Sequence, residues 1–295
     1  MNSQPTVGFI GLGLMGQAMA ANLLLAGFNL HIHSRTKAKA KQLIGQGARW
    51  YDHPHQLAAN LRGGIIIICV SDSSALATVI NNPHGLLPQL SADTLIIDMG
   101  TSRFDLTLEL AKAVTEKGGH YLDAPVSGGQ KGAQDANLSV MVGGTEAQLT
   151  RAMPAFNAMA ASITHVGPTG CGQIAKTANQ MIVGVSVGIV AEALHLAQQA
   201  GADTGQVKQA LSGGFADSKI LQIHGQRMVD HTFTPGARAT TQLKDMQQAS
   251  ILAQQLGIAL PLLDLSTRQW QAMVDAGQGE LDQSGYLAWI ERLNA

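Results

Sequence analysis

A glycine-rich turn between an apolar strand and a helix is the feature that most constrains this chain. In "VGFIGLGLMGQAMAANLLLAG" a short apolar run is followed by Gly11, Gly13 and Gly16 in GxGxxG spacing, at the start of a helical pattern. Gly11 permits a tight turn, Gly13 lets the backbone approach a pyrophosphate, and Gly16 lets the helix pack close to the sheet. The free N–H groups at the helix start then face the phosphates. The pattern predicts a dinucleotide site whose turn consists of Gly11, Leu12, Gly13, Leu14, Met15 and Gly16.

Short apolar runs alternate with helical patterns through the first half of the chain. The predicted strands are Thr6–Ile10, Asn29–His33, Ile65–Val70, Thr94–Asp98, His120–Asp123, Leu138–Val142 and one near Ile163–His165. The predicted helices are Leu14–Ala26, Lys37–Gln46, Phe104–Lys117 and Glu146–Met159, the last preceded by a capping-box pattern at Thr145 and Gln148. This alternation is typical of βαβ units and a mainly parallel sheet.

After about residue 166 the strand signals stop and only helical patterns follow. They lie at about Ile174–Ala200, Thr204–Leu211, Lys219–Met228, Thr241–Leu256, Leu262–Ala276 and Ser284–Leu293. A chain of 295 residues exceeds the size at which single cores tend to split. We therefore predict an α/β fold with an N-terminal Rossmann dinucleotide-binding domain at 1–166. An all-α domain at 167–295 follows, and a long interdomain helix joins the two.

Composition excludes several classes of function. Lys and Arg number 19 against 20 Asp and Glu, and without a basic run the sequence does not favour nucleic-acid binding. The longest aliphatic run, Ile65–Val70, is too short to span a bilayer, and the first residues lack a basic signal-peptide region. Neither the two cysteines nor the ten histidines show metal-ligand spacing. We expect a cytoplasmic protein with no membrane partner, no metal site and no disulfide framework.

The end of the second predicted strand bears on the choice of cofactor. NAD-binding folds usually carry an acid there for the ribose 2′-hydroxyl, whereas this chain has Ser34, Arg35 and Thr36. A guanidinium attracts a 2′-phosphate, so the sequence favours NADP(H), with NAD(H) as the alternative cofactor. The other interpretation is that Arg35 merely begins the next helix on a solvated surface. Val70, Ser71 and Thr101 follow the third and fourth predicted strands and are further candidate cofactor neighbours.

Two later segments carry residues suited to a reaction. In "DAPVSGG", Ser127 offers a hydroxyl and Gly128 and Gly129 can turn successive N–H groups toward an anion, although an ordinary Pro/Gly loop has the same composition. In "GPTGCGQIAKTANQ", Lys176 is one of only two charged residues from Gln173 through Ala200. Lysine is costly to bury, so by itself it would be a solvated residue of the first helical turn.

Together these motifs resemble the β-hydroxyacid dehydrogenase family over about residues 5–293. The resemblance rests on "FIGLGLMG", "DAPVSGG", "VMVGG", the run from Gly167 to Asn179, and "LKDM". Within the family the sequence is most similar to the tartronate semialdehyde (2-hydroxy-3-oxopropionate) reductases, notably in "KTANQMIVG", "LSGGFADSKIL" and "FTPGAR". The resemblance implies an active site in the cleft between the two domains and a homodimer or homotetramer.

The resemblance also assigns roles to individual residues. It implies that Lys176 is catalytic and that an amide one helical turn later, Asn179 or Gln180, works beside it. The implied substrate-carboxylate loop is Ser127, Gly128 and Gly129, Thr101 is implied near the nicotinamide, and Lys244 and Asp245 are implied near the substrate end of the cleft, with Lys244 also near the cofactor. The chain departs from the family pattern at Gly100, Ala136-Asn137 and Ala237, which leaves the identity of the substrate open.

A carbonyl that accepts hydride becomes an alkoxide, which a protonated amine can stabilise and then protonate. A lysine with an ordinary pKa near 10.4 is already protonated at neutral pH, which favours the direction of reduction. We therefore predict an NADP(H)-dependent reductase of a small aldehyde acid, of the tartronate semialdehyde to glycerate type. The alternatives are a 3-hydroxyisobutyrate or 3-hydroxypropionate type dehydrogenase and a non-catalytic dinucleotide sensor. An imine reductase has another group at the lysine position, so Lys176 argues against it.

Overall fold

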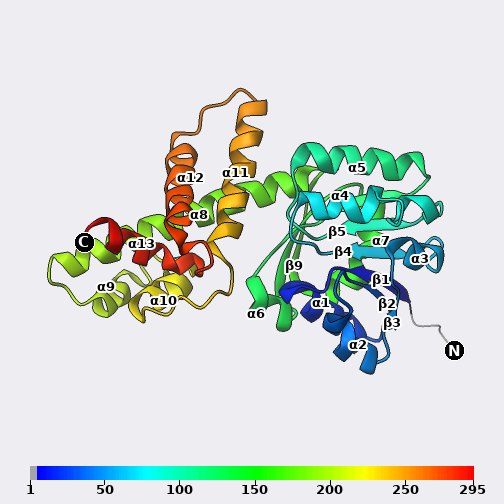
Figure 1. Cartoon of the computed structure of the whole chain (residues 1–295), viewed down its shortest axis with the longest axis horizontal. Coiled ribbons are helices and arrows are strands. Elements are labelled where there is room, and N and C mark those ends of the chain that lie inside the picture. Colours follow the sequence, from blue (N-terminus) through cyan, green and yellow to red (C-terminus); the bar gives the residue numbers. More distant parts are fainter. Residues whose placement is uncertain (1–4) are drawn as a thin grey trace. The chain divides into compact units, whose positions relative to one another are not determined.

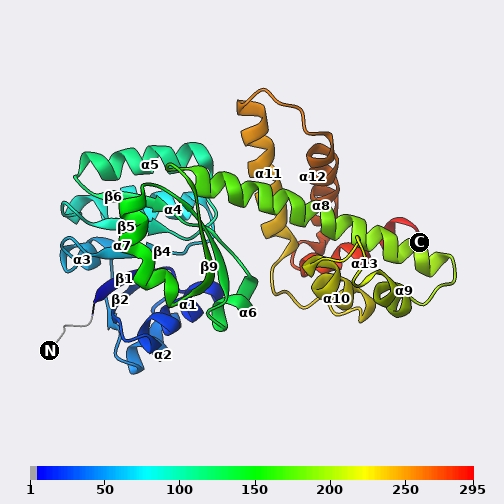
Figure 2. The same ribbon diagram turned by 180° about the vertical axis from the view of Figure 1, so that it is seen from behind.

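The chain forms two compact units in this computed structural model, which describes residues 5–295. By internal contacts the units are Met1–Lys176 and Thr177–Ala295. The first is built on a sheet with helices on both faces, and the second is helical, as Figures 1 and 2 show from opposite sides. The predicted fold class is confirmed.

The sheet of the first unit has the strand order β3-β2-β1-β4-β5-β6-β8-β7, with β9 paired to β8. The first six strands in this order, from β3 across to β6, run parallel. Strand β8 is antiparallel to β6 and β7 and parallel to β9. The strands are β1 (Thr6–Ile10), β2 (Asn29–His33), β3 (Arg49–Trp50), β4 (Ile65–Ile68), β5 (Leu95–Asp98), β6 (His120–Asp123), β7 (Val126–Ser127), β8 (Leu138–Gly143) and β9 (Ala160–Gly167). The two-residue strands β3 and β7 were not predicted, because a segment so short shows no periodicity.

Two apolar clusters cover the two faces of this sheet. On one face, side chains such as Phe9 and Ile97 pack with α1 (Leu14–Leu25), α2 (Lys41–Gly45), α6 (Gly129–Gln134) and α7 (Glu146–Asn157). On the other, Ile66 and Ile96 pack with α3 (Pro54–Ala59), α4 (Ser73–Asn81) and α5 (Phe104–Glu116). Helices α3, α4 and α6 were not predicted, because α3 and α6 are short and α4 begins with polar residues. The predicted capping box at α7 is present, with Thr145 and Gln148 bonding reciprocally.

The helical unit begins within α8 (Cys171–Gln199), which starts in the first unit. The other helices are α9 (Thr204–Leu211), α10 (Gln226–Val229), α11 (Ala239–Gln255), α12 (Pro261–Met273) and α13 (Tyr286–Leu293). Short π-helical turns at Leu221–Gly225 and Val274–Gln278 occupy parts of the predicted α-helical runs. The core of this unit surrounds Trp270, which is fully buried and donates its Nε1–H to the carbonyl of Gly184 at 3.2 Å.

Helix α8 is, among residues 5–295, the one helix whose length and apolar composition would allow it to cross a membrane. A helix in the core of a globular protein passes the same test, so the finding is weak evidence.

Candidate functional site

The three glycines of the turn after β1 differ in what surrounds them. Gly11 has φ +102°, and a Cβ there would lie 2.2 Å from the carbonyl oxygen of Cys69. A Cβ on Gly16 would lie 1.9 Å from the carbonyl oxygen of Gly11. Both are therefore required by the packing of the chain itself. A Cβ on Gly13 would meet nothing within 4 Å, so the backbone at Gly13 borders open space that a ligand could occupy.

A cavity of about 870 Å³ opens beside this turn. Many of the predicted cofactor residues line it: Gly11, Leu12, Gly13, Ser34, Arg35, Thr36, Val70 and Ser71. Leu14, Met15 and Gly16 belong to the start of α1, and Thr101 follows β5. The Ser34 hydroxyl accepts a hydrogen bond from the N–H of Leu12 at 3.4 Å, which ties the end of β2 to the glycine turn.

The cavity also has a wall that the sequence did not indicate. Lys37, Lys39, Trp50, Asp52, His53 and His84 line it together with Arg35. Strand β3 brings Trp50 to the end of β2, where the rings of His33 and Trp50 lie 5.7 Å apart, and His84 comes from the segment after α4. The Lys37 ammonium lies 5.5 Å from the centre of the Trp50 ring. Three cationic side chains, those of Arg35, Lys37 and Lys39, thus line the cavity in which a 2′-phosphate was predicted to bind.

Two carboxylates on the same wall have partners within it. Asp52 accepts a hydrogen bond from Trp50 Nε1 at 2.8 Å, and this bond holds the pKa of Asp52 below its ordinary value. Asp72 caps α4, accepting from the N–H of Ala75 at 2.9 Å and from the Ser71 hydroxyl at 2.6 Å. No acid lies at 34–36, directly after β2.

A buried polar cluster lies at the carboxyl ends of β5 and β6. Asp98 and Asp123 are register partners in these strands, and both are fully buried. Asp98 accepts from the Ser102 hydroxyl at 2.8 Å and from the N–H of Gly100 at 2.9 Å. Burial raises the pKa of Asp98 to about 7, although these two hydrogen bonds act in the opposite direction. The absence of a side chain at Gly100, where the family often has serine, fits this site: a Cβ there would lie 3.0 Å from the carbonyl oxygen of Val70.

The second aspartate of the cluster holds the start of α8. Asp123 accepts from the N–H groups of Gly170 at 2.7 Å and Gln173 at 2.9 Å. Burial raises the pKa of Asp123, and these two hydrogen bonds partly counteract it. The approach is close, because a Cβ on Gly172 would lie 2.4 Å from the carbonyl oxygen of Met141. The glycine-rich entry to α8 therefore lets the helix begin against the sheet.

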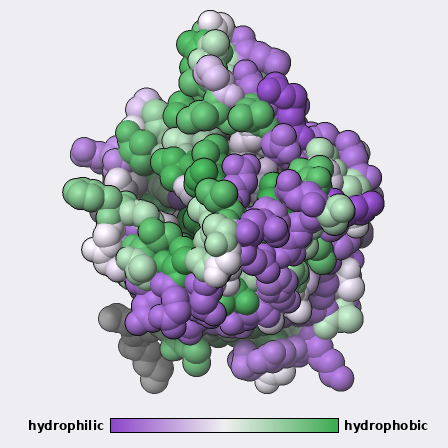
Figure 3. Space-filling model, turned by 90° about the vertical axis from the view of Figure 1, so that its left-hand side faces the viewer, coloured by the Kyte–Doolittle hydropathy of each residue, from purple (hydrophilic) through white to green (hydrophobic). Residues whose placement is uncertain are grey.

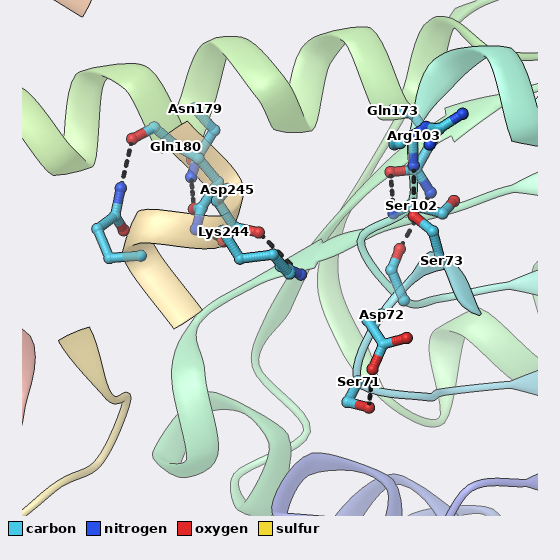
Figure 4. A network of polar contacts seen from close by, with 12 residues as sticks. Ser71, Asp72, Ser73, Ser102, Arg103, Gln173, Asn179, Gln180, Lys244 and Asp245 are labelled. Carbon is cyan, nitrogen blue, oxygen red and sulfur yellow. Dashed lines mark hydrogen bonds and ion pairs between the residues drawn. The ribbon is translucent and has the colours of Figure 1, made fainter. Parts of the chain in front are cut away.

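Gln173 connects the two parts of the cluster. Its Oε1 accepts from the N–H of Ser102 at 3.1 Å, and its Nε2 donates to the carbonyl of Gly100 at 3.0 Å (Figure 4). Lys176 follows three residues later in the same helix and is only 8% exposed. The interpretation of Lys176 as a solvated first-turn residue is therefore wrong.

The predicted carboxylate loop lies between β7 and α6. Ser127 pairs with Ser139 across β7 and β8. Gly128 and Gly129 follow with φ +135° and +63°, successive conformations that L side chains rarely adopt. A Cβ on Gly129 would meet nothing within 4 Å. This backbone is one that glycine favours.

In the helical unit, four predicted residues form one chain of polar contacts (Figure 4). Lys244 Nζ lies 3.0 Å from Asp245 Oδ1, and Asp245 Oδ2 accepts a hydrogen bond from Gln180 Nε2. Gln180 Oε1 in turn accepts from Asn179 Nδ2 at 2.8 Å. Gln180 is buried and engaged at both ends of its amide, with Asn179 at the end of the chain of contacts.

The loop that carries Ala237 is held by another buried carboxylate. The N–H groups of Gly236 and Ala237 donate to Asp282 Oδ2 at 2.9 and 3.2 Å. Asp282 is fully buried and also contacts Arg227 Nη1 at 2.7 Å. Ala237, where the sequence departs from the family pattern, thus lies on a backbone that these hydrogen bonds hold in place.

Comparison with known proteins places this arrangement in a family. Residues 6–167 match the NAD binding domain of 6-phosphogluconate dehydrogenase, and residues 170–290 match the NAD-binding domain of NADP-dependent 3-hydroxyisobutyrate dehydrogenase. The chain is 39% identical to 2-hydroxy-3-oxopropionate reductase of Escherichia coli over 97% of both chains.

Solved structures agree with this placement. A 3-hydroxyisobutyrate dehydrogenase from Salmonella typhimurium superimposes with a TM-score of 0.87 at 26% identity, covering 97% of this chain and 99% of that one. Psf3, solved in complex with NADP+ and 2-OPP, gives a TM-score of 0.88 at 26% identity, with coverage of 96% and 99%. The chain belongs to the 3-hydroxyisobutyrate dehydrogenase-like family of NAD(P)-dependent β-hydroxyacid dehydrogenases.

Proposed function

We propose that the chain is an NADP(H)-dependent reductase that converts a small aldehyde acid, 2-hydroxy-3-oxopropionate (tartronate semialdehyde), to glycerate. The observation that carries the proposal is the cavity beside the glycine turn. Its wall combines open space at Gly13 with the cations Arg35, Lys37 and Lys39. That wall suits a dinucleotide with an additional phosphate on its ribose.

The choice between the two nicotinamide cofactors rests on charge. A carboxylate directly after β2 would repel a 2′-phosphate, and the chain has Ser34, Arg35 and Thr36 there. Asp52, an acid on the cavity wall, is hydrogen-bonded to Trp50. Arg35 is accordingly assigned the 2′-phosphate, with Ser34 and Thr36 at its side, and NAD(H) is the weaker cofactor.

Bound NADPH supplies the hydride for reduction of the carbonyl. We assign Lys176 the role of stabilising the developing alkoxide and giving it a proton. Its burial supports the assignment, since a charged amine is retained in such a place only with partners or a function. Ser127, Gly128 and Gly129 are assigned to the substrate carboxylate, and Thr101 to the neighbourhood of the nicotinamide.

The amide that assists the lysine is assigned to Asn179. Gln180 uses both ends of its amide on Asp245 and Asn179, so it orients its neighbour. Asn179 follows Lys176 by three residues, a spacing that brings two side chains to the same side of a helix. Lys244 and Asp245 complete the assignment by holding Gln180 in place, and Lys244 is the residue of this pair assigned to the cofactor.

The proposal extends to assembly and location. Ile182, Ile189 and Leu196 recur at seven-residue spacing on α8 and are 68%, 58% and 71% exposed. Apolar patches of this kind also gather on the face in Figure 3, and contiguous ones mark contact surfaces. They support a homodimer or homotetramer, and we place the enzyme in the cytoplasm.

The test is oxidation of NADPH, and of NADH for comparison, against a panel of short aldehyde acids. We expect 2-hydroxy-3-oxopropionate to be the best substrate. Preference for methylmalonate semialdehyde or malonate semialdehyde would instead establish a 3-hydroxyisobutyrate or 3-hydroxypropionate dehydrogenase. Binding of NADPH without turnover of any of these acids would favour a dinucleotide sensor.

Two variants separate binding from chemistry. Arg35→Ala should weaken NADPH far more than NADH, with Arg62→Ala as a control at an exposed arginine outside the cavity wall. Lys176→Ala should keep NADPH binding and lower kcat by about 10²- to 10⁴-fold, with Lys117→Ala as its exposed control. Equal weakening of both cofactors, or unchanged turnover in Lys176→Ala, would contradict the respective assignment.

A further inference from the structure

The side-chain amide of Gln173 forms hydrogen bonds with the backbone on both sides of Thr101. Oε1 accepts from the N–H of Ser102 at 3.1 Å, and Nε2 donates to the carbonyl of Gly100 at 3.0 Å. In extended backbone the C=O of one residue and the N–H two residues later point to the same side, which is how a neighbouring strand would bind them. Gln173 therefore supplies with one side chain what a further strand would supply with its backbone.

The glutamine is itself held firmly. It is 1% exposed, and its own N–H donates to Asp123 Oδ2 at 2.9 Å. The backbone packs closely around it, since a Cβ on Gly143 would lie 2.5 Å from Asp123 Oδ1 and 2.7 Å from the nitrogen of Gly172. A side chain anchored at the sheet in this way can fix the position of whatever it binds.

We propose that Gln173 is a positioning residue that fixes the loop carrying Thr101 and the helical turn carrying Lys176 relative to each other. The proposal rests on the proposed function, in which Thr101 lies near the nicotinamide and Lys176 gives up the proton. Gln173 precedes Lys176 by one helical turn, so displacement of its side chain from the loop shifts the lysine relative to the residues at the end of β5. A misplacement of about 1 Å is enough to cost about 10²-fold in rate.

The role requires a group that both donates and accepts. A carboxamide does so, a thioether of the same length does neither, and an ionised carboxylate only accepts. A protonated carboxyl has one O–H and one carbonyl oxygen, so it restores both bonds. The titratable groups of the cluster are Asp98, from β5, and Tyr121 and Asp123, from β6, with Cys69 near Asp98 and Lys176 one turn along α8. Two buried acids beside position 173 disfavour a third negative charge there.

The experiment compares Gln173→Met and Gln173→Glu in the full chain, with Gln42→Met as a control at an exposed glutamine of α2. The value of kcat with NADPH is measured from pH 5.5 to 8.5 and divided by the wild-type value at each pH, together with the Kd of NADPH. We expect Gln173→Met to lose about 10- to 100-fold in kcat at every pH while its NADPH Kd changes by less than about twofold. Gln173→Glu should show the same loss at pH 8.5 and recover toward wild type as the pH falls.

A general loss of packing would not produce recovery at acid pH. A Gln173→Glu ratio that stays level across the pH range, or a Gln173→Met variant with wild-type kcat, would overturn the proposal. Should Gln173→Met fail to fold, the pH dependence of Gln173→Glu decides the matter.

A second measurement separates this proposal from the proposed function. If the wild type turns over none of the aldehyde acids, the proposed function is wrong. Amide hydrogen exchange at Ser102 then tests the clamp, meaning the two hydrogen bonds from the Gln173 amide to Gly100 and Ser102, without any turnover. We expect exchange at Ser102 to be up to about tenfold faster in Gln173→Met than in wild type, while Gln42→Met leaves it unchanged. Unchanged exchange at Ser102 in Gln173→Met would overturn the clamp.

Discussion

Each unit of the molecule contains a completely buried aspartate whose pKa is strongly shifted, Asp98 in the first and Asp282 in the second, and the two shifts have opposite directions. At the end of β5, burial raises the pKa of Asp98 to about 7. In the helical unit, burial also raises the pKa of Asp282, but hydrogen bonds from His224 and Ser284 and from the Gly236 backbone outweigh it and hold that pKa far below its usual range. Two aspartates without exposed surface thus have pKa values that are shifted in opposite directions.

The difference lies in the charge of the partners. Asp98 receives hydrogen bonds from neutral groups, those of Gly100 and Ser102, and it has Asp123 as its register partner in β6. Asp282 lies against the Arg227 guanidinium at 2.7 Å and 3.5 Å from His224 Nδ1. The helical unit therefore fixes its loop with a charged pair, whereas the end of β5 keeps a carboxyl that is protonated up to about pH 7.

Removal of Asp282 should have the largest effect on stability. Asp282→Ala leaves the partly exposed Arg227 without its carboxylate and two loop N–H groups without an acceptor, and at about 1–3 kcal/mol for each unsatisfied N–H this should cost about 2–5 kcal/mol in free energy of unfolding at pH 7. Urea denaturation measures it, with Asp230→Ala as an exposed control. A loss below about 1 kcal/mol would mean that the pair does not hold the loop.

Asp98 should lower the free energy of unfolding as the pH rises, because its pKa is raised in the folded chain. The folded chain keeps the Asp98 proton up to about pH 7, whereas the unfolded chain releases it near 3.8. The unfolding free energy should therefore fall by at most about 4 kcal/mol as pH rises from 4 to 7, and stay level above. Asp98→Asn should reduce this slope to the part that the raised pKa of Asp123 contributes, and Asp135→Asn, at an exposed site, should keep it in full. An identical slope in wild type and Asp98→Asn would remove the contrast with Asp282.

The tight packing around Asp123, in the sheet unit, should have a smaller effect on stability than either of these aspartates. A Cβ at Gly143 would lie 2.5 Å from Asp123 Oδ1, so Gly143→Ala should destabilise the fold by about 1–3 kcal/mol. Gly45→Ala, in α2 with nothing within 4 Å of its Cβ, should instead stabilise by about 0.5–1 kcal/mol. Thermal melting of both variants tests the pair of predictions. Equal changes in Tm of the same sign would argue against close packing of α8 on the sheet.

Tyr121 should show the smallest effect. Its hydroxyl donates to Asp98 Oδ2 at 3.5 Å, a long bond, so Tyr121→Phe should cost about 1 kcal/mol or less. The cost should be confined to pH above 7, where Asp98 is ionised, and chemical denaturation at pH 5.5 and 8.5 measures it. A cost that is larger at pH 5.5 would contradict the assigned protonation of Asp98.

Features fixed by local chemistry could be predicted from the sequence. Strands β1, β2 and β6 begin and end at the predicted residues, because each carries apolar side chains in a short segment that lies between helical patterns or turns. The turn at Gly11 is equally local, since its φ of +102° suits glycine. Helix α4, with the sequence "SSALATVIN", was missed because its polar start looks like a loop.

The rest of the candidate site depends on segments that only the fold brings together. Trp50 reaches the cavity from β3 and His84 from the segment after α4, and neither lies in a recognisable motif. Gln173 was seen only as part of a glycine-rich run. One signal was available: the strands "LIID" and "HYLD" both end in aspartate, and adjacent parallel strands place such residues side by side.

The division between the two units falls inside a continuous helix, between Lys176 and Thr177. Each added residue in an α-helix turns everything after it by about 100°. A single-residue insertion after Lys176 would therefore rotate Asn179 and everything after it by about 100° relative to the lysine, whereas the loop around Gly213 could change length without any such rotation. Within this family, length variation should accumulate in the loops, and helical units exchanged between relatives should function only when the graft within α8 preserves the residue count.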